Sequence, residues 1–231
     1  MIFFYRYSDK GKDPVDYGYN TTKKDCWYSF LNSFSKQKIV VVCDNCEKES
    51  LDFFKSDAFK IFDISIVETN LGNSKNAIFT YRYALKNFPE QNYYFCEDDY
   101  IHEGMFLPDL LEEALEYVDY CSLYDHGDKY KNYCGNPNPL LRGLGEQTEL
   151  FRTDSSHWKL TNSTTMTFAT KYDVLKKDID FIEKFANMSI PRDFDMFMGL
   201  NKKGRTLATP IPSKSTHLSP DKDNLAPFFE I

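Results

Sequence analysis

Three consecutive carboxylates, Glu97, Asp98 and Asp99, are the residues of this chain best suited to chemistry. They follow four apolar or aromatic residues, 93–96, that predict a buried strand. The carboxylates should therefore lie at the carboxyl edge of a sheet, where open α/β sheets bind ligands. Adjacent carboxylates repel one another unless a positive charge neutralises them, and their hard oxygen atoms suit Mg²⁺ or Mn²⁺. The pattern predicts a metal site, although an acidic turn that caps the next helix is the alternative.

Three further places could contribute reactive groups. Asp44 follows a continuous apolar run, 39–43, and could either accept a hydrogen bond from a nucleoside base or cap a helix. Asp193 and Asp195 lie at the predicted start of a helix, whose dipole would keep a nearby carboxylate ionised. Simple capping is the alternative there. His217, on a short strand near the end of the chain, could be a metal ligand or an ordinary structural residue.

Strand and helix patterns alternate through the first half of the chain. Apolar runs predict strands at 2–7, 39–43, 60–67, 93–96 and 121–124. Apolar residues at helical spacing predict helices with buried faces at 27–34, 77–88 and 107–118, and a short helix at 47–55. This β/α alternation with short connections predicts an α/β fold, with a mainly parallel sheet flanked by helices.

The second half has a different character. Its Gly, Asn and Pro content predicts a long loop from 125 to 148. Short strands are predicted near 149–152, 156–160, 164–170 and 215–219. Helices are predicted over 171–187 and from 193 to about 203. Because domains of about 100–200 residues are typical, we expect a single domain over 1–231.

The composition narrows the classes of partner. A net charge of −7 argues against a nucleic-acid partner, because the chain has no basic stripe to displace phosphate counterions. No apolar run approaches the roughly 20 residues of a membrane span, and no signal-peptide pattern is present, so we expect a cytoplasmic protein. The six cysteines should be reduced thiols. Cys43 and Cys46 have zinc-knuckle spacing, but no second pair follows at a suitable distance.

The order of these pieces resembles the GT-A glycosyltransferases, particularly the small family-2-like enzymes that use nucleotide sugars. In that family a strand ends in an acid that holds the base, as 39–44 does here. A segment with the pattern Asn-x-Gly-x-x-x-Asn-Ala precedes a helix, and residues 70–77 match it. An apolar strand then delivers a metal-binding DxD motif, which 97–99 resembles. An acidic pair at a helix start and a late histidine follow, and 191–195 and His217 are similar.

The resemblance spans roughly residues 1–220, with two departures from the family pattern. Glu97 stands where the first acid of the DxD motif is Asp, which leaves open which carboxylate touches the metal. Arg192 stands where the family usually has Glu before Asp193. The catalytic base is therefore left open between Asp193 and Asp195.

The resemblance implies a metal-dependent glycosyltransferase that moves a sugar from a UDP-sugar to a hydroxyl of a carbohydrate or glycoconjugate, with inversion. Residues 1–124 would bind the nucleotide sugar, and 125–231 would bind the acceptor and carry the base. Mn²⁺ or Mg²⁺ would be held by Asp99, His217 and Glu97. The nucleotide would contact Tyr5, Arg6, Asp44, Asn70, Lys75, Glu97 and Asp98, with Arg6 and Lys75 as candidates for the pyrophosphate. The acceptor would contact His157 and Trp158. Guanosine in place of uridine remains open.

Three other classes of protein agree less well with the sequence than a glycosyltransferase does. A sugar-nucleotide nucleotidyltransferase would have a Gly-rich basic loop after its first strand, which 8–13 matches poorly. A haloacid-dehalogenase-type phosphatase would need a nucleophilic Asp in the place of Glu97. A non-catalytic carbohydrate-binding module would explain the aromatic content of 16%, but not the β/α alternation with acids at a strand end.

Overall fold

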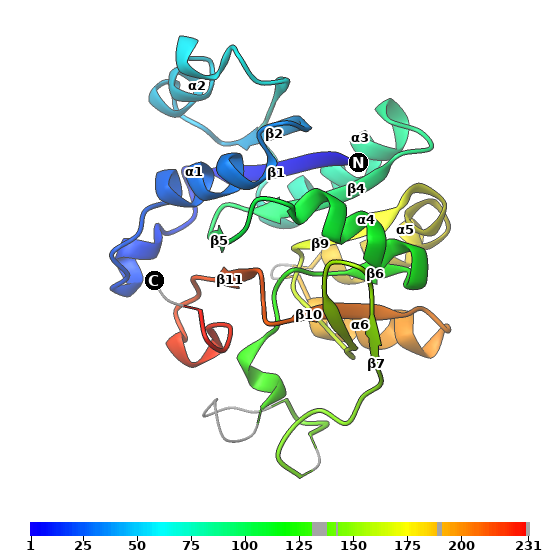
Figure 1. Ribbon diagram of the computed structural model, residues 1–231. Coiled ribbons are helices and arrows are strands. Elements are labelled where there is room, and N and C mark those ends of the chain that lie inside the picture. The colour runs from blue at the N-terminus through cyan, green and yellow to red at the C-terminus, as the bar shows by residue number, and fades with distance from the viewer. Residues whose placement is uncertain (131–137, 142, 189–190, 230–231) are drawn as a thin grey trace.

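A nine-stranded sheet runs through the protein, whose computed structural model describes residues 1–130, 138–141, 143–188 and 191–229 (Figure 1). The strands follow the order β3-β2-β1-β4-β9-β6-β10-β8-β7. The parallel strands of the first half are β3 (Ile64–Thr69), β2 (Lys38–Asp44), β1 (Ile2–Ser8) and β4 (Asn92–Glu97). The predicted α/β class with a parallel first half is therefore confirmed.

The second half adds a mixed set of strands to the same sheet. β9 (Phe168–Lys171) runs antiparallel to both β4 and β6 (Tyr120–Cys121), so both halves of the chain share one continuous sheet. The strands beyond β6 are β10 (Leu207–Ile211), β8 (His157–Leu160) and β7 (Leu150–Arg152). A separate two-stranded sheet pairs β5 (Tyr100–His102) with β11 (Ser215–His217).

Helices cover both faces of the sheet, because successive residues of each strand point to opposite sides (Figure 1). In β1, Phe3 and Tyr5 belong to one hydrophobic core, and Ile2 and Phe4 belong to the other. The first core is covered by α1 (Lys23–Phe34) and α4 (Leu107–Tyr117), and the second by α3 (Asn73–Asn87), α5 (Tyr172–Ala186) and α6 (Asp193–Lys202). The short α2 (Lys48–Phe54) follows β2.

Some strands differ from the sequence prediction. β5 and β10 are absent from it, and β10 contains Pro210, which cannot donate to a strand ladder. Because β6 pairs only with the first two residues of β10, Pro210 lies beyond the end of β6. The strand expected at 121–124 ends at Cys121, and the strand expected at 60–67 begins only at Ile64. These differences leave the order of the elements unchanged.

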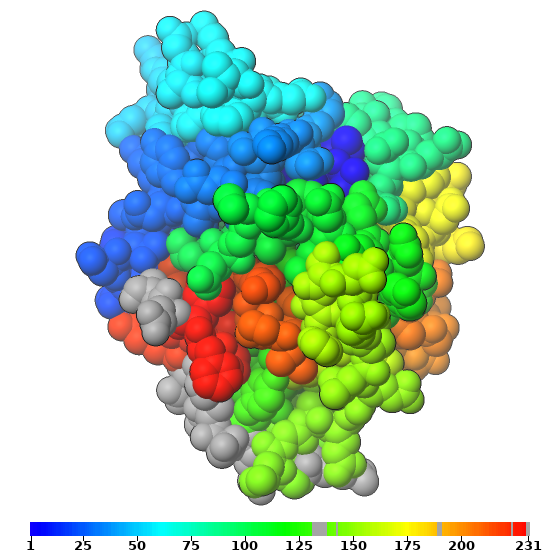
Figure 2. Space-filling model, viewed as in Figure 1, coloured from blue at the N-terminus to red at the C-terminus, as the bar shows by residue number. Residues whose placement is uncertain are grey.

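The C-terminal segment packs against the loop between β1 and α1. Figure 2 shows the red end of the chain beside this blue loop. The Tyr19 hydroxyl donates to the Ser219 carbonyl at 2.9 Å, and Lys222 Nζ donates to the Gly18 carbonyl at 2.9 Å. The loop contains a 3-10 turn (Pro14–Tyr17) that is closed by a capping box from Asp13. The loop is thereby held at its outer end by residues about 200 positions later in the chain.

Aromatic side chains fill much of the core. The largest fully buried side chains include both tryptophans, Trp27 and Trp158, and tyrosines from β1, β4, β5 and β6. Among the described residues, five cysteines are free thiols and four of these are buried, as the expectation of reduced core thiols requires. Cys134 lies outside the described residues.

His102 of β5 should make the stability of the protein depend on pH. Its Nε2 lies 2.8 Å from the Tyr94 hydroxyl, and its ring packs against Phe30 and Phe34. Burial lowers the pKa of His102 from 6.5 to about 3. Between these pH values the unfolded chain binds one more proton than the folded chain. The free energy of unfolding should therefore fall by up to about 1.4 kcal/mol per pH unit as the pH drops through this window.

Urea denaturation followed by circular dichroism between about pH 4 and 7 measures this effect. The His102→Gln variant should be less stable than the wild type at pH 7, but its stability should depend less on pH. His157→Gln, at an exposed position of β8, is the matched control and should keep the wild-type slope. Equal slopes for wild type and His102→Gln would contradict the assignment.

Candidate active site

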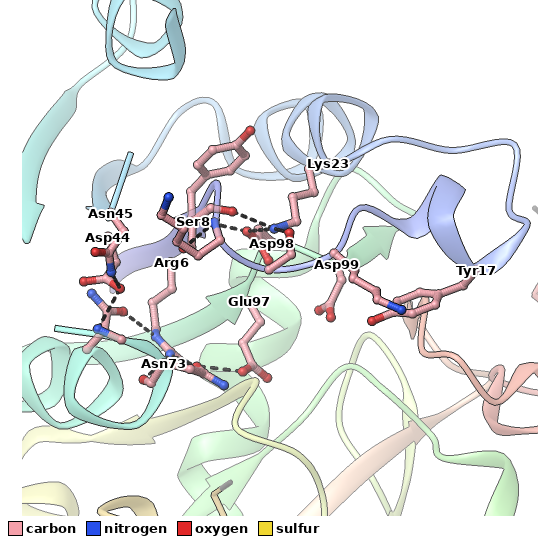
Figure 3. A pocket seen from close by; sticks show the side chains of 16 residues that line it. Arg6, Ser8, Tyr17, Lys23, Asp44, Asn45, Asn73, Glu97, Asp98 and Asp99 are labelled. Carbon is pink, nitrogen blue, oxygen red and sulfur yellow. Dashed lines mark hydrogen bonds and ion pairs between the residues drawn. The ribbon is translucent and has the colours of Figure 1, made fainter. Parts of the chain in front are cut away.

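A cavity of about 380 Å³ lies at the carboxyl ends of β1, β2 and β4, the edge where open α/β sheets bind ligands (Figure 3). The strand register explains which residues meet there. Arg6 of β1 pairs with Glu97 of β4, and Ser8 of β1 pairs with Asp44 of β2. Five of the residues predicted from the sequence line the cavity: Arg6, Asp44, Glu97, Asp98 and Asp99.

Each of the three adjacent carboxylates has a cation of its own. The cations come from β1, from the first turn of α1 and from β11. The three ion pairs are Glu97–Arg6 (Oε1 to Nη1, 3.3 Å), Asp98–Lys23 (Oδ2 to Nζ, 2.9 Å) and Asp99–His217 (Oδ2 to Nε2, 3.1 Å). The positive charge that adjacent carboxylates require is thus supplied by side chains from three separate segments.

Arg6 joins the acidic cluster to the start of α3. Its side chain is buried, and Nε donates to Asn76 Oδ1 at 2.9 Å (Figure 3). Nη2 donates to the Asn73 carbonyl at 2.9 Å and also to the Asn73 side chain. With the Glu97 contact, four of the five guanidinium N–H groups are occupied within the protein. Arg6 lines the cavity as predicted, but most of its donors orient protein groups.

Asp44 holds the loop between β3 and α3. Its Oδ1 accepts from the Thr69 hydroxyl and the Leu71 N–H, both at 2.8 Å. Its Oδ2 accepts from the Gly72 N–H at 3.0 Å and from Asn45 Nδ2 at 2.7 Å. The matched segment 70–77 is therefore fixed to the end of β2 by one carboxylate. A contact from Asp44 to a nucleoside base stays a prediction.

Asp98 holds the loop after β1 through a lysine that the sequence reasoning missed. Asp98 Oδ2 accepts from the Ser8 N–H at 2.9 Å and pairs with Lys23. Lys23 Nζ also donates to the carbonyls of Ser8 at 2.6 Å and Gly11 at 3.3 Å. Burial raises the pKa of Asp98 although Lys23 opposes this shift. One signal was available in the sequence: a lysine in the first turn of a helix opposes the helix dipole and therefore calls for an anionic partner.

Asp99 and His217 form a partly buried pair beside the cavity. Asp99 Oδ1 is buried and has no hydrogen-bond partner among the described residues. The Tyr100 ring stacks on the His217 imidazole with centroids 4.8 Å apart, and the pairing of β5 with β11 sets this contact. Burial lowers the pKa of His217, but Asp99 raises it and the net shift is upward. Burial raises the pKa of Asp99, but the charges of His217 and Lys23 lower it, and the net shift is downward. Both shifts favour a charged pair.

Glu97 is the acid of the cluster whose proton is held most firmly. Burial raises its pKa to about 7, with Arg6 opposing the shift and Asp99 adding to it. The Glu97 backbone N–H donates to the Thr167 hydroxyl at 3.1 Å, which ties this end of β4 to the segment before β9. Glu97 therefore differs from Asp99 in charge state near neutral pH, although the two lie in one acidic run.

The structure separates the two candidate bases, Asp193 and Asp195. Asp193 is the first residue of α6, and its carboxylate is influenced by the charges of His217 and His126, which places it within electrostatic range of the acidic cluster. Asp195 is partly exposed and pairs with Arg192 at 2.5 Å. Burial raises the pKa of Asp193, although the Phe194 N–H hydrogen bond opposes this. The helix dipole was expected to keep Asp193 ionised, whereas the net shift of its pKa is upward because burial is the largest influence.

Three residues predicted for the nucleotide do not line the cavity. Tyr5 is fully buried between Trp27 and Phe30, because odd-numbered residues of β1 face the first core. Asn70 and Lys75 are exposed on the surface around the start of α3. The sequence pattern placed segment 70–77 at the start of α3, next to the cavity. Whether the side chains of Asn70 and Lys75 point into the cavity depends on how α3 packs.

The two predicted acceptor residues lie apart from the cavity. Trp158 is fully buried, stacks on Phe151 and donates from Nε1 to the Thr153 hydroxyl at 3.3 Å. Its ring is part of the core, so the expected stacking on a sugar is not available to it. His157 is exposed at the start of β8. Part of the loop predicted at 125–148, residues 131–137 and 142, lies outside the described residues.

Asp99 and His217 alone could not complete the coordination shell of a divalent metal, so a bound substrate would have to supply further oxygen atoms. Among the described residues, no three His, Cys, Asp or Glu side chains converge as a complete metal site. Asp99 offers a buried oxygen without a partner among the described residues, and His217 could offer Nε2 only after losing the proton that this nitrogen shares with Asp99. Mg²⁺ commonly binds one or two carboxylates and completes its shell with phosphate oxygens and water.

In the part of the chain that the structure describes, no helix is long and apolar enough to span a membrane.

The buried Lys23–Asp98 pair should be essential for stability. We expect Lys23→Met to lower the free energy of unfolding by about 3 kcal/mol, because it leaves the buried Asp98 carboxylate without its cation. Lys24→Met, one residue further in α1, removes a half-exposed lysine and should change stability by less than about 1 kcal/mol. Chemical denaturation measures both values.

Adding Asp98→Asn to Lys23→Met should restore part of the loss, since the unpaired charge disappears. This double-mutant comparison isolates the ion pair from the packing of the lysine stem. Equal destabilisation by Lys23→Met and Lys24→Met would show that the pair has no special role.

Comparisons with known proteins support the fold. No protein-family model and no curated protein sequence matches the chain. Solved structures that match include the nucleoside-diphosphate-sugar pyrophosphorylase from Vibrio cholerae, with a TM-score of 0.53, 12% identity, and coverage of 96% of this chain and 97% of that one. TarS 1–349 from S. aureus matches with a TM-score of 0.50, 14% identity, and coverage of 90% of this chain and 58% of that one.

The glycosyltransferase GlyE from Streptococcus pneumoniae also matches, with a TM-score of 0.48, 11% identity and coverage of 90% of this chain. The chain spans 44% of the length of GlyE. At these low sequence identities, the similarity concerns only the way in which the backbones are arranged. The chain therefore shares the expected GT-A-like α/β fold with these structures.

Proposed function

We propose that the protein is a glycosyltransferase that moves a sugar from a nucleoside-diphosphate sugar, with UDP as the carrier, to a hydroxyl group of a carbohydrate or glycoconjugate. The observation that carries this proposal is the Asp99–His217 pair at the carboxyl edge of the sheet, with an unpartnered Asp99 oxygen next to a nucleotide-sized cavity. The GT-A-like fold supports the proposal, as does the electrostatic influence of Asp193 on Glu97 and His217.

The donor would lie in the cavity at the ends of β1, β2 and β4. Asp99 and His217 would hold Mn²⁺ or Mg²⁺ together with the diphosphate, and the metal would supply positive charge to the leaving group. Asp193 would accept the proton of the attacking hydroxyl. That oxygen bonds to the anomeric carbon as the bond from this carbon to the diphosphate breaks, and the bonding electrons stay with the diphosphate. Attack from the opposite face inverts the anomeric configuration.

A sugar-nucleotide nucleotidyltransferase is the second candidate. The specific observation in its favour is that Lys10, Gly11 and Lys12, from the loop after β1, line the cavity. The sequence had indicated that this loop is a poor match to a basic phosphate loop. The pyrophosphorylase similarity covers nearly the whole of both chains. Incubation with UTP and a sugar 1-phosphate, with detection of released pyrophosphate, distinguishes this activity from release of UDP from a UDP-sugar.

Donor binding is tested by thermal unfolding with UDP and Mn²⁺ together. At a free ligand concentration of 100 times Kd, the native state gains about 2.7 kcal/mol, which corresponds to a rise in Tm of roughly 5–10 °C for a chain of this size. Asp99→Ala should remove the metal-dependent part of this rise. Asp195→Ala, which removes a partly exposed acid that does not line the cavity, should retain it. A full metal-dependent rise in Asp99→Ala would move the metal to other residues.

The base is tested by comparing Asp193→Asn with Asp195→Asn. We expect Asp193→Asn to fold and bind UDP normally but to lose at least about 100-fold in turnover, because general base catalysis commonly contributes this much. Asp195→Asn should keep nearly wild-type turnover. Transfer is measured with a panel of UDP-sugars and acceptors, and NMR gives the anomeric configuration of the product. Equal turnover in both variants, or a product with the configuration of the donor, would contradict this mechanism.

A further inference from the structure

The acidic residues that line the cavity leave little negative charge without a partner. Glu97, Asp98 and Asp99 each face a cationic side chain. Asp44 accepts four hydrogen bonds from the protein. A ligand that enters the cavity therefore meets carboxylates whose charge is already compensated by neighbouring groups.

Two cations of the same cavity have no such compensation. Lys10 and Lys12 line the cavity and are exposed. In the described parts of the chain, neither ammonium group forms a hydrogen bond or an ion pair, and the Lys12 ammonium lies 5.5 Å from the centroid of the Tyr17 ring. Lys10 and Lys12 are therefore the cations of the cavity lining that remain free to form an ion pair with a ligand, although the whole chain carries −7.

The segment that carries these lysines is fixed at the positions around them. Asp9 accepts from the Glu47 N–H at 2.7 Å and from the Ser50 hydroxyl at 2.8 Å. The Gly11 carbonyl accepts from Lys23, and a side chain at position 11 would begin only 3.0 Å from Lys23 Nζ.

Asp13 continues the same pattern. Its carboxylate accepts from the Lys23 N–H at 3.2 Å and from the Val15 N–H at 3.3 Å. Residues 9, 11 and 13 are therefore anchored to the protein, whereas the ammonium groups of Lys10 and Lys12 have no hydrogen-bond or ion-pair partner among the described residues. A braced loop with unpartnered charges is preorganised for an anion, because little ordering is needed when the anion binds.

We propose that Lys10 and Lys12 form a clamp for the phosphate groups of a diphosphate-containing ligand. The proposal rests on the proposed function in identifying this ligand as the donor nucleotide. Two lysines near the acidic cluster would offset the repulsion between Asp99 and the phosphates. Lysine ammonium groups act as point charges toward phosphate, so the clamp would recognise charge and leave the identity of the nucleoside to other residues.

Isothermal titration calorimetry in the presence of EDTA tests the clamp without a metal. The ligands are UDP, GDP, uridine and inorganic pyrophosphate. The Lys10→Gln/Lys12→Gln variant should bind UDP and pyrophosphate at least tenfold more weakly than the wild type, and uridine equally. Lys86→Gln/Lys177→Gln removes two exposed lysines, of α3 and α5, that do not line the cavity and makes the same change in net charge. It should bind all four ligands within twofold of the wild type.

The outcomes separate the clamp from the donor assignment. Unchanged UDP affinity in Lys10→Gln/Lys12→Gln, or an equal loss in the control variant, would overturn the clamp and leave the donor standing. Lysine-dependent binding of pyrophosphate without binding of UDP or GDP would support the clamp and overturn the donor. Absence of metal-free binding of every phosphate ligand to the wild type would overturn the clamp, and the donor assignment would fall with it if UDP and Mn²⁺ together also fail to raise Tm. Thermal unfolding of each variant verifies that it is folded.

Discussion

The candidate active site depends on the neutralisation of three adjacent carboxylates at the end of β4. Their cations come from residues 6, 23 and 217, which lie far apart in the sequence. Charges that are taken out of water are costly unless they are paired with good geometry. The end of β4 can therefore adopt this structure only when β1, α1 and β11 are all in place. Apart from any contact with a ligand, the three acids therefore need β1, α1 and β11 to be correctly packed around the end of β4.

The same three cations also shape the cavity. Arg6 orients the start of α3 through Asn73 and Asn76, and Lys23 fixes the loop after β1 through two carbonyl groups. His217 connects the small β5–β11 sheet to Asp99. Of the three acids, only Asp99 keeps a buried oxygen without a hydrogen-bond partner in the described part of the chain. The three acids therefore differ in what they can do: two hold the walls of the cavity, and one remains available to a ligand or a metal.

The sequence was sufficient for features that depend on local pattern and on parallel register. The apolar runs located β1, β2 and β4, and parallel strands bring their carboxyl ends together, so Arg6, Asp44 and the acids were expected at one edge. Features that depend on how a helix packs could not be predicted in this way. Lys23 and Lys75 both lie in the first turn of a helix, yet Lys23 reaches Asp98 and Lys75 is exposed. Trp158 was similarly ambiguous, because an aromatic residue on a short strand suits a core as well as a sugar site.

Net charge and local charge have different consequences for this protein. The value of −7 describes the whole surface, and it argues against a long polyanion such as nucleic acid, which would contact much of that surface. A small anion responds mainly to charges within about one Debye length, roughly 8 Å at physiological ionic strength. Inside the cavity, three of the acids are paired with Arg6, Lys23 and His217, whereas Lys10 and Lys12 have no ion-pair partner in the described part of the chain. An acidic chain can therefore present a phosphate-binding cavity, because the pattern of pairing decides which charges a ligand meets.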